Sequence, residues 1–322
     1  MATSGSIDFT MTGFEIVEKA VAIVAERSSE IPLQNNEVSD GLNALNRMAK
    51  HFQGQGLHLW KREEGVLFLD PGITSYKLGP QGAEATMLDD FIDAEITVAA
   101  LSGVNVITVD DTTGMQGLID SGVADFIGIE LDDGTRQWTT IANVSSSTEL
   151  QITDNLTDDV AIGNSVFTFT TLIERPLRIE AARRLRLGDN SEIELNKWAR
   201  QQYFAQTNKN SKGTPTNFYY TPQLGNGEIF IWQTADSVNQ LLKFTFQRSI
   251  EDFDTSADTL DFPIEWADAL VWGLAARIGF EYQAPLQKMQ LIKQNAEQFL
   301  DDMLGWDEET VSLNIQPSPT RA

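Results

Sequence analysis

Histidine and cysteine, residues that often bind metals or act as nucleophiles, are almost missing from this chain. The sequence has no cysteine and two histidines, His51 and His58. Disulfides, thiolate nucleophiles and cysteine-ligated metals are therefore excluded. The two histidines stand seven positions apart without other clustered ligands, and this spacing argues against a zinc site.

Long hydrophobic runs are also missing. No apolar run approaches the roughly 20 residues that a membrane span requires. The first residues, Met1 to Ser6, lack the basic start of a signal peptide, and Glu15, Glu18 and Lys19 interrupt the apolar pattern that follows. We therefore expect neither a signal peptide nor a membrane partner.

Positive charge is scarce. The chain has 23 Lys and Arg against 47 Asp and Glu, a net charge of −24. Proteins that bind DNA by neutralising phosphates are expected to be basic, so sequence-specific DNA binding is disfavoured. Between Glu84 and Thr170 the sequence has sixteen acidic residues and one basic residue, Arg136, which gives this segment a net charge of −15. This segment therefore reads as a separate acidic module, whose charge serves solubility and self-repulsion.

Motifs of common enzymes are missing as well. The sequence has no Gly-Lys-Thr or Gly-Lys-Ser phosphate loop and no Gly-x-Ser-x-Gly elbow, and 47 acidic residues cannot nominate a catalytic pair. The aspartate-rich turns at 110–111, 132–133 and 154–159 lack the spacing of a calcium loop, so Asp is expected to serve local backbone bonds there. We therefore predict no enzymatic activity, and no catalytic, cofactor-binding or metal-ligating residues.

Helical periodicity marks both ends of the chain. Thr12 and Glu15 form a capping-box pattern that opens a helix ending near Ser28, and a second helix is expected from Ser39 or Asp40 to Gly54. Near the other end, Pro263 suits a first helical turn, and two apolar stripes follow, at 264–278 and 286–303, joined by a turn at 279–284. None of these helices can bury its stripe alone, so we expect the four to form one bundle.

The middle of the chain has β-type patterns. Short strands are predicted at 96–101, 104–109, 126–131, 137–141, 149–152 and 166–169, with Asp133-Gly134 as a hairpin turn. They predict a small antiparallel barrel or sandwich. Helices are predicted again at Leu177 to Leu187 and from Ser191 or Glu192 to about Ala205, followed by strands at 217–220, 228–232 and 241–246.

The predicted fold class is therefore α+β, with a helical bundle formed by the terminal helices, an inserted antiparallel β barrel or sandwich, and a further short sheet. Residues 1–78 and 172–306 are assigned to the helical core with its sheet, residues 79–171 to the inserted acidic β domain, and residues 307–322 to an extended C-terminal tail.

Five arginines depart from the acidic balance: Arg175, Arg178, Arg183, Arg184 and Arg186. They are candidates for a patch that contacts DNA phosphates, or for partners of carboxylates in the acidic module or a neighbouring subunit. Among the tryptophans, most lie in patterns that predict burial, whereas Trp138 in the acidic module is a candidate for stacking on a sugar.

Short motifs at both ends resemble the head-to-tail adaptor, or head-completion, proteins of short-tailed bacteriophages. In the first half they are Gly56-Leu57-His58-Leu59-Trp60, then Leu67-Phe68-Leu69 with the Pro71-Gly72 turn and Tyr76. In the second half they are Leu260-Asp261-Phe262-Pro263-x-x-Trp266 and Leu304-Gly305-Trp306. The resemblance covers roughly residues 8–78 and 172–316.

The resemblance implies a structural virion protein of the head-to-tail junction, assembled in the host cytoplasm. Such proteins form rings, of twelve copies as a rule, that dock under the portal, extend the DNA channel without sequence-specific DNA binding, and provide the attachment point for tail nozzle or tail fibre proteins. Carried over to this chain, it implies that the tail docks on the portal through Asp307, Val311, Leu313, Ile315 and Pro317. The alternative is a tail-associated module that binds a carbohydrate or a protein through the β insert.

Overall fold

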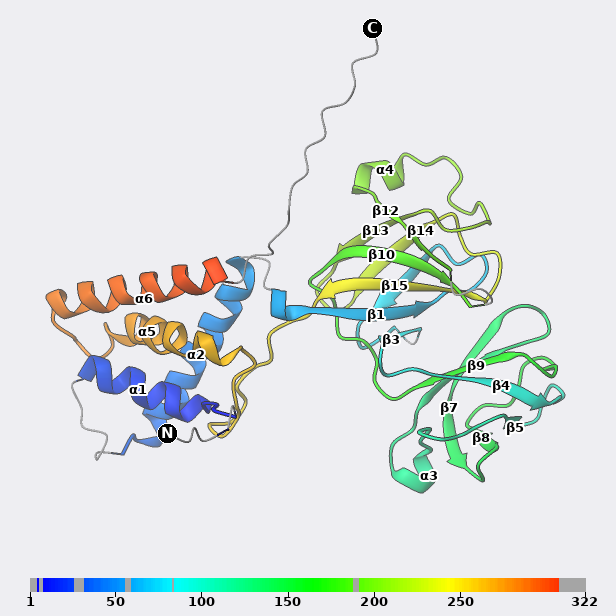
Figure 1. The fold of residues 1–322 in the computed structure, drawn as a ribbon, viewed down its shortest axis with the longest axis horizontal. Coiled ribbons are helices and arrows are strands. Elements are labelled where there is room, and N and C mark those ends of the chain that lie inside the picture. The colour runs from blue at the N-terminus through cyan, green and yellow to red at the C-terminus, as the bar shows by residue number, and fades with distance from the viewer. Residues whose placement is uncertain are drawn as a thin grey trace, which may run out of the picture. The chain divides into compact units, whose positions relative to one another are not determined.

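The computed structural model describes residues 5, 8–25, 32–55, 59–82, 84–187 and 191–306. The chain divides into two compact units. One unit combines Met1–Lys61 with Ile250–Ala322, and the other is Arg62–Ser249, so residues 62–78 belong to the second unit (Figure 1). Helices and several β-sheets are both present, which confirms the mixed α+β class.

The N-terminal helices of the first unit are α1 (Gly13–Ala25) and α2 (Asn35–Gln55). The predicted capping box is present, because Glu15 Oε2 accepts a hydrogen bond from Thr12 N and Thr12 Oγ1 accepts one from Glu15 N. The predicted start of α2 at Ser39 or Asp40 is wrong. The helix begins at Asn35, where Glu37 Oε2 accepts a hydrogen bond from Gln34 N and caps the first turn.

The C-terminal helices of this unit are the 3₁₀ turn η2 (Ile264–Trp266), α5 (Ala267–Ile278) and α6 (Leu286–Trp306). Pro263 directly precedes η2 and does not lie in the first helical turn, where the sequence placed it. The Oδ2 atom of Asp261 accepts a hydrogen bond from Glu251 N, in the segment before the helix. Helix α5 packs against α1, α2 and α6, and buried residues of all four helices belong to one hydrophobic core. Figure 1 shows α5 between α6 and α1.

The second unit begins and ends on paired strands. Strand β1 (Arg62–Phe68) pairs antiparallel with β15 (Gln240–Gln247), in a register that places Arg62 opposite Gln247. These two strands lie inside a five-stranded sheet with the order β11-β10-β15-β1-β3. In this sheet β3 is Ala85–Met87, β10 is Arg178–Arg186 and β11 is Ser191–Glu194. A four-stranded sheet has the order β12-β13-β14-β2, with β2 at Ser75–Leu78, β13 at Asn217–Pro222 and β14 at Gly227–Trp232.

The predicted β insert is a closed antiparallel barrel. Its strand order is β4-β5-β8-β7-β6-β9, and the short helix α3 (Leu118–Ser121) lies between β5 and β6. The strands are Ile92–Val98, Val106–Val109, Phe126–Glu130, Arg136–Val144, Glu149–Ile152 and Ser165–Phe169 for β4 to β9. At the predicted hairpin, Gly134 takes a φ of +80°, which L side chains rarely adopt, and Asp133 Oδ1 accepts a hydrogen bond from Thr135 N.

The helices predicted between Leu177 and Ala205 are wrong. The described residues of this segment form β10 (Arg178–Arg186), β11 (Ser191–Glu194) and β12 (Asn196–Lys197), and among them only α4 (Arg200–Phe204) is helical. A β-bulge between Ile179 and Ala181 shifts the alternation of side chains, so Ile179 and Ala182 are both buried at a spacing that resembles a helix turn. Pairing with β15 and β11 then outweighs the helical preference of the Ala- and Arg-rich sequence.

The two faces of β1 pack in different hydrophobic cores. Leu67 belongs to the core shared by the five- and four-stranded sheets, whereas Val66 and Phe68 pack with Phe167 and Phe169 of the barrel. A third cluster fills the barrel interior. The alternation along a single strand therefore joins the sheets and the barrel into one unit.

Two glycines of α2 give a matched test of the contact between α1 and α2. A Cβ on Gly41 would lie 2.4 Å from Val17 Cγ1, whereas a Cβ on Gly54 would meet nothing within 4 Å. We expect Gly41→Ala to lower the free energy of unfolding by about 1 kcal/mol or more, because overpacking outweighs the gain in helix propensity. Gly54→Ala should leave it equal or raise it by about 0.5 kcal/mol. Chemical denaturation monitored by circular dichroism measures both, and equal effects would contradict the close approach.

Candidate interaction surfaces

Two of the motifs that carry the resemblance meet in one aromatic cluster of the first unit, whereas Phe68 and Tyr76 of the other motifs pack in cores of the second unit. Trp266 is fully buried, with its ring centroid 5.9 Å from that of Phe262 and 6.4 Å from that of Phe52. The Phe262 centroid lies 5.1 Å from that of Trp60. Residues from both ends of the chain thus share one packing site, which is structural rather than chemical in character.

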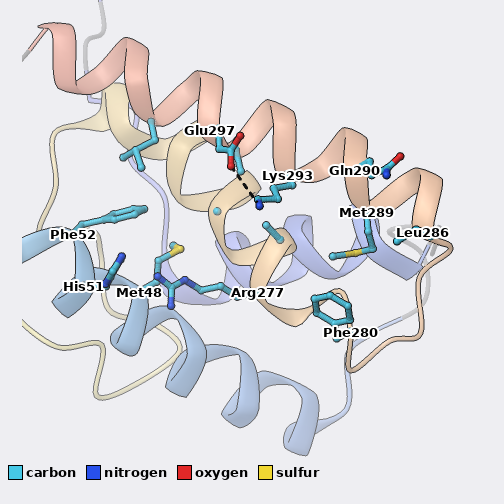
Figure 2. Close-up of a pocket in the computed structure, with 14 residues that line it drawn as sticks. Met48, His51, Phe52, Arg277, Phe280, Leu286, Met289, Gln290, Lys293 and Glu297 are labelled. Atoms are coloured by element: carbon cyan, nitrogen blue, oxygen red, sulfur yellow. Dashed lines mark ion pairs between the residues drawn. The ribbon is translucent and has the colours of Figure 1, made fainter. Parts of the chain in front are cut away.

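A groove of about 590 Å³ lies between α2, α5 and α6. Gly273 and Ala276 of α5 line it together with Met48 and Phe52 of α2 and with Met289 of α6. Figure 2 shows Phe280 and Leu286 at one end of the groove and Phe52 at the other. Phe280 is 79% exposed and Leu286 is 74% exposed, so the apolar lining continues to the surface.

One arginine of this groove has no carboxylate partner. Arg277 lines it, and burial of its guanidinium together with the neighbouring Arg47 lowers the pKa of Arg277. The other charged residues of the lining are Lys293 and Glu297, whose Nζ and Oε1 lie 3.7 Å apart. Within the described part of the chain, neither Arg277 nor Arg47 has an ion-pair partner, although Arg47 borders a second hollow together with Asp40 and Glu281.

Sequence reasoning missed this groove. Leu286 was assigned to the buried stripe of the last helix, and Phe280 fell in the predicted turn. An aromatic residue in a turn, directly beside a stripe that begins with leucine, was the available signal for an exposed apolar site.

The five candidate arginines do not lie on a helix. Arg175 precedes β10, and the other four are on that strand. Arg184 is buried at 4% exposure, whereas Arg178 and Arg186 are exposed near its two ends. The strand therefore does not gather all five on one surface, because its side chains alternate between faces.

Arg183 belongs to a cross-strand network of ion pairs on the five-stranded sheet. Its Nη2 lies 2.8 Å from Glu64 Oε1, and its Nε lies 3.7 Å from Glu192 Oε2. Lys243 Nζ is 2.7 Å from Glu192 Oε1. Carboxylates of the same unit thus neutralise this arginine; a role of the patch towards DNA or a neighbouring subunit stays a prediction.

A buried arginine lies where the barrel packs on the sheet. The guanidinium carbon of Arg136 on β7 lies 5.0 Å from the ring centroid of Phe167 and 5.6 Å from that of Phe68, and its Nη2 donates a 2.7 Å hydrogen bond to Val238 O. Its Nη1 lies 3.7 Å from Asp70 Oδ1. Burial raises the pKa of Asp70 from 3.8 to about 6, although Arg136 opposes this shift.

The barrel does not present Trp138 as an open stacking platform. Its ring centroid lies 5.3 Å from that of Phe68 and 5.7 Å from that of Phe169, in the layer between barrel and sheet. Exposed apolar residues lie elsewhere on the barrel, where Val98, Leu101 and Val104 border a hollow of about 480 Å³.

The aspartate-rich turns make hydrogen bonds both within a turn and between loops. Asp111 Oδ1 accepts one from Thr113 N, as predicted for a local turn, whereas Asp159 Oδ1 accepts one from the distant Ser102 N. In the residues that the structure describes, no group of three or more His, Asp or Glu side chains gathers in a geometry that could hold a metal ion. The prediction of local bonds is therefore confirmed at Asp111 and wrong at Asp159.

The predicted portal-docking residues Asp307, Val311, Leu313, Ile315 and Pro317 lie outside the described residues, as does His58. Of the helices in the described part of the chain, none has both the length and the apolar character needed to cross a bilayer.

Asp70 gives a test of the buried charge layer. In the folded state its pKa is about 6 and its ordinary value is 3.8, so its contribution to stability is full below pH 3.8 and is lost as the pH rises through 6. We expect wild type to lose stability relative to Asp70→Asn between pH 4 and pH 7, by about 2 kcal/mol. Urea unfolding at several pH values measures this difference. Asp301→Asn on exposed α6 changes the net charge equally and should show no such trend; parallel curves for wild type and Asp70→Asn would contradict the burial effect.

The chain was compared with known proteins. No protein family matched the sequence, and no curated protein matched it. Among solved structures, the chain is similar to VP17, a capsid protein of bacteriophage P23-77, with 10% sequence identity over 58% of this chain and 83% of that chain. The TM-score is 0.13, which is too low to carry an argument about fold or function.

Proposed function

We propose that this protein is a structural component of a bacteriophage virion, a ring-forming head-to-tail adaptor. In this proposal the four terminal helices form one bundle that faces the portal and neighbouring copies. The ring docks under the portal, continues the DNA channel and provides the attachment point for later tail proteins. It has no enzymatic turnover.

One observation carries the proposal. Two of the motifs that resemble the adaptor family come from opposite ends of the sequence, and Trp60 of one packs together with Phe262 and Trp266 of the other in one core. Packing of this kind is expected if the two regions were retained as parts of one functional unit. It supports the view that the resemblance is a property of a folded unit and not of two unrelated short matches.

The acidic composition fits a channel component. A net charge of −24 disfavours tight binding of phosphates, so DNA can slide past such a surface without being held. Arg183 is paired with Glu64 and Glu192, which reduces its availability to DNA. Low affinity for DNA is the useful property in this role.

The test is to mix the protein with the portal ring of its own source and count copies per complex by native mass spectrometry. We expect a multi-subunit ring on the portal, twelve copies as a rule of the family. A chain ending at Trp306, and a full-length chain with Val311, Leu313 and Ile315 changed to serine, should both bind less, because the tail supplies the portal contact. Absence of any complex with the portal would overturn the proposal.

A second candidate is protein binding through the barrel, which its exposed apolar residues favour. Leu101 is 70% exposed and Val98 is 56% exposed, beside the hollow on the barrel surface. The packed position of Trp138 gives no such support to carbohydrate stacking.

We expect Leu101→Asp to weaken the binding of the tail nozzle protein of the same source at least several-fold. The matched control is Leu224→Asp, because Leu224 is fully exposed in the turn between β13 and β14. Surface plasmon resonance measures both affinities. Equal binding by the two variants would show that the hollow on the barrel is not the contact site.

A further inference from the structure

The groove between α2, α5 and α6 has the properties of a peptide-binding site. Its floor contains the small residues Gly273 and Ala276, which leave room above α5. Phe280 and Leu286 extend the apolar surface out of the groove at one end. Exposed apolar surface next to a helical groove is the usual setting for a docked segment with regularly spaced apolar side chains.

The arginines at the groove indicate which kind of segment can bind there. Arg277 in the groove and Arg47 beside it repel each other and have no ion pair among the described residues. A ligand with carboxylates next to apolar side chains would neutralise these arginines while it covers Phe280 and Leu286. Complementarity of this kind fixes the register of a bound segment and selects its partner.

The chain itself contains a segment with this composition. Residues 307–315 read Asp-Glu-Glu-Thr-Val-Ser-Leu-Asn-Ile, three acidic residues followed by apolar residues at every second position. An extended segment places Val311, Leu313 and Ile315 on one face. Nine extended residues span roughly 30 Å, and the part of α6 that borders the groove, from Leu286 to Leu300, spans about 21 Å. The segment is therefore long enough.

The connection of this segment to α6 decides which copy it fits. The segment begins directly after Trp306. Arg277 lies beside the middle of α6, because Gly279 at the end of α5 packs on Met289 and Trp272 stacks on Phe299. That position is about 20 Å along the helix from Trp306, whereas Asp307 to Glu309 can reach back only about 10 Å, so they cannot neutralise Arg277 of their own chain. A segment from another copy is free of this limit.

We propose that, as long as no portal is bound, residues 307–315 of one copy bind in the groove between α2, α5 and α6 of a second copy. The contact is head-to-tail, because the donating and accepting surfaces differ, and repeated contacts of this kind close into a ring when the rotation allows it. The inference rests on the proposed self-association of the chain. It is tested without the portal, so its failure can be told apart from a failure of portal docking.

The absence of native cysteine makes a crosslinking test direct. Two full-length variants are mixed: Gln290→Cys, at an exposed position that lines the groove, and Ser312→Cys, which keeps all three apolar residues of the segment. One variant carries an affinity tag, so that the mixed dimer differs in size. After oxidation, a non-reducing gel should show the mixed dimer. The matched control is Gln298→Cys, which is exposed on the same helix but does not line the groove.

We expect the mixed dimer to form several-fold more with Gln290→Cys than with Gln298→Cys. A second substitution, Arg277→Glu, should reduce the yield several-fold, whereas Arg200→Glu, which reverses an exposed arginine of the other unit, should not. Equal yields at positions 290 and 298 would overturn the proposal. So would a doubly substituted chain that crosslinks only within itself, since the segment would then occupy the groove of its own copy.

Discussion

The pairing of β1 with β15 is the constraint on which the rest of the structure depends. Arg62 lies opposite Gln247, so the chain leaves the helical unit and returns to it through neighbouring strands at one end of a single sheet. The chain between these two strands therefore starts and ends at neighbouring positions. The N- and C-terminal helices can then share one core despite their separation in sequence. The barrel can accordingly be added to the middle of the chain without altering how its ends meet.

Basic residues are used differently in the two units. Basic residues are few, and several are used within the second unit, where Arg183 and Lys243 neutralise Glu192 and Arg136 is buried among aromatic rings. The arginines beside the helical groove are different, because they are left without carboxylate partners in the described part of the chain. In an acidic protein, this local excess of positive charge directs acidic segments to one surface and keeps them from others.

The extent to which the fold could be predicted varied with the physical signal. The barrel strands and the terminal helices were predicted because their side chains follow a regular period, and Glu149–Ile152 was predicted to the residue. Strand β10 was mistaken for a helix because its bulge places Ile179 and Ala182 on the same side. The exposed apolar end of the groove had a signal in the sequence, but the groove itself could not be predicted, since it depends on which helices leave a gap between them, and sequence periodicity contains no information about that.

Closure of the barrel has a further consequence for how the protein behaves at high concentration. A closed ring of strands has no free edge, so the barrel offers no backbone donors or acceptors for pairing with another molecule. The open five-stranded sheet ends on one side in β11, a short strand with exposed Glu192 and Glu194, which resists strand addition by charge. At the barrel and at β11, crowded copies are therefore hindered from pairing through backbone hydrogen bonds.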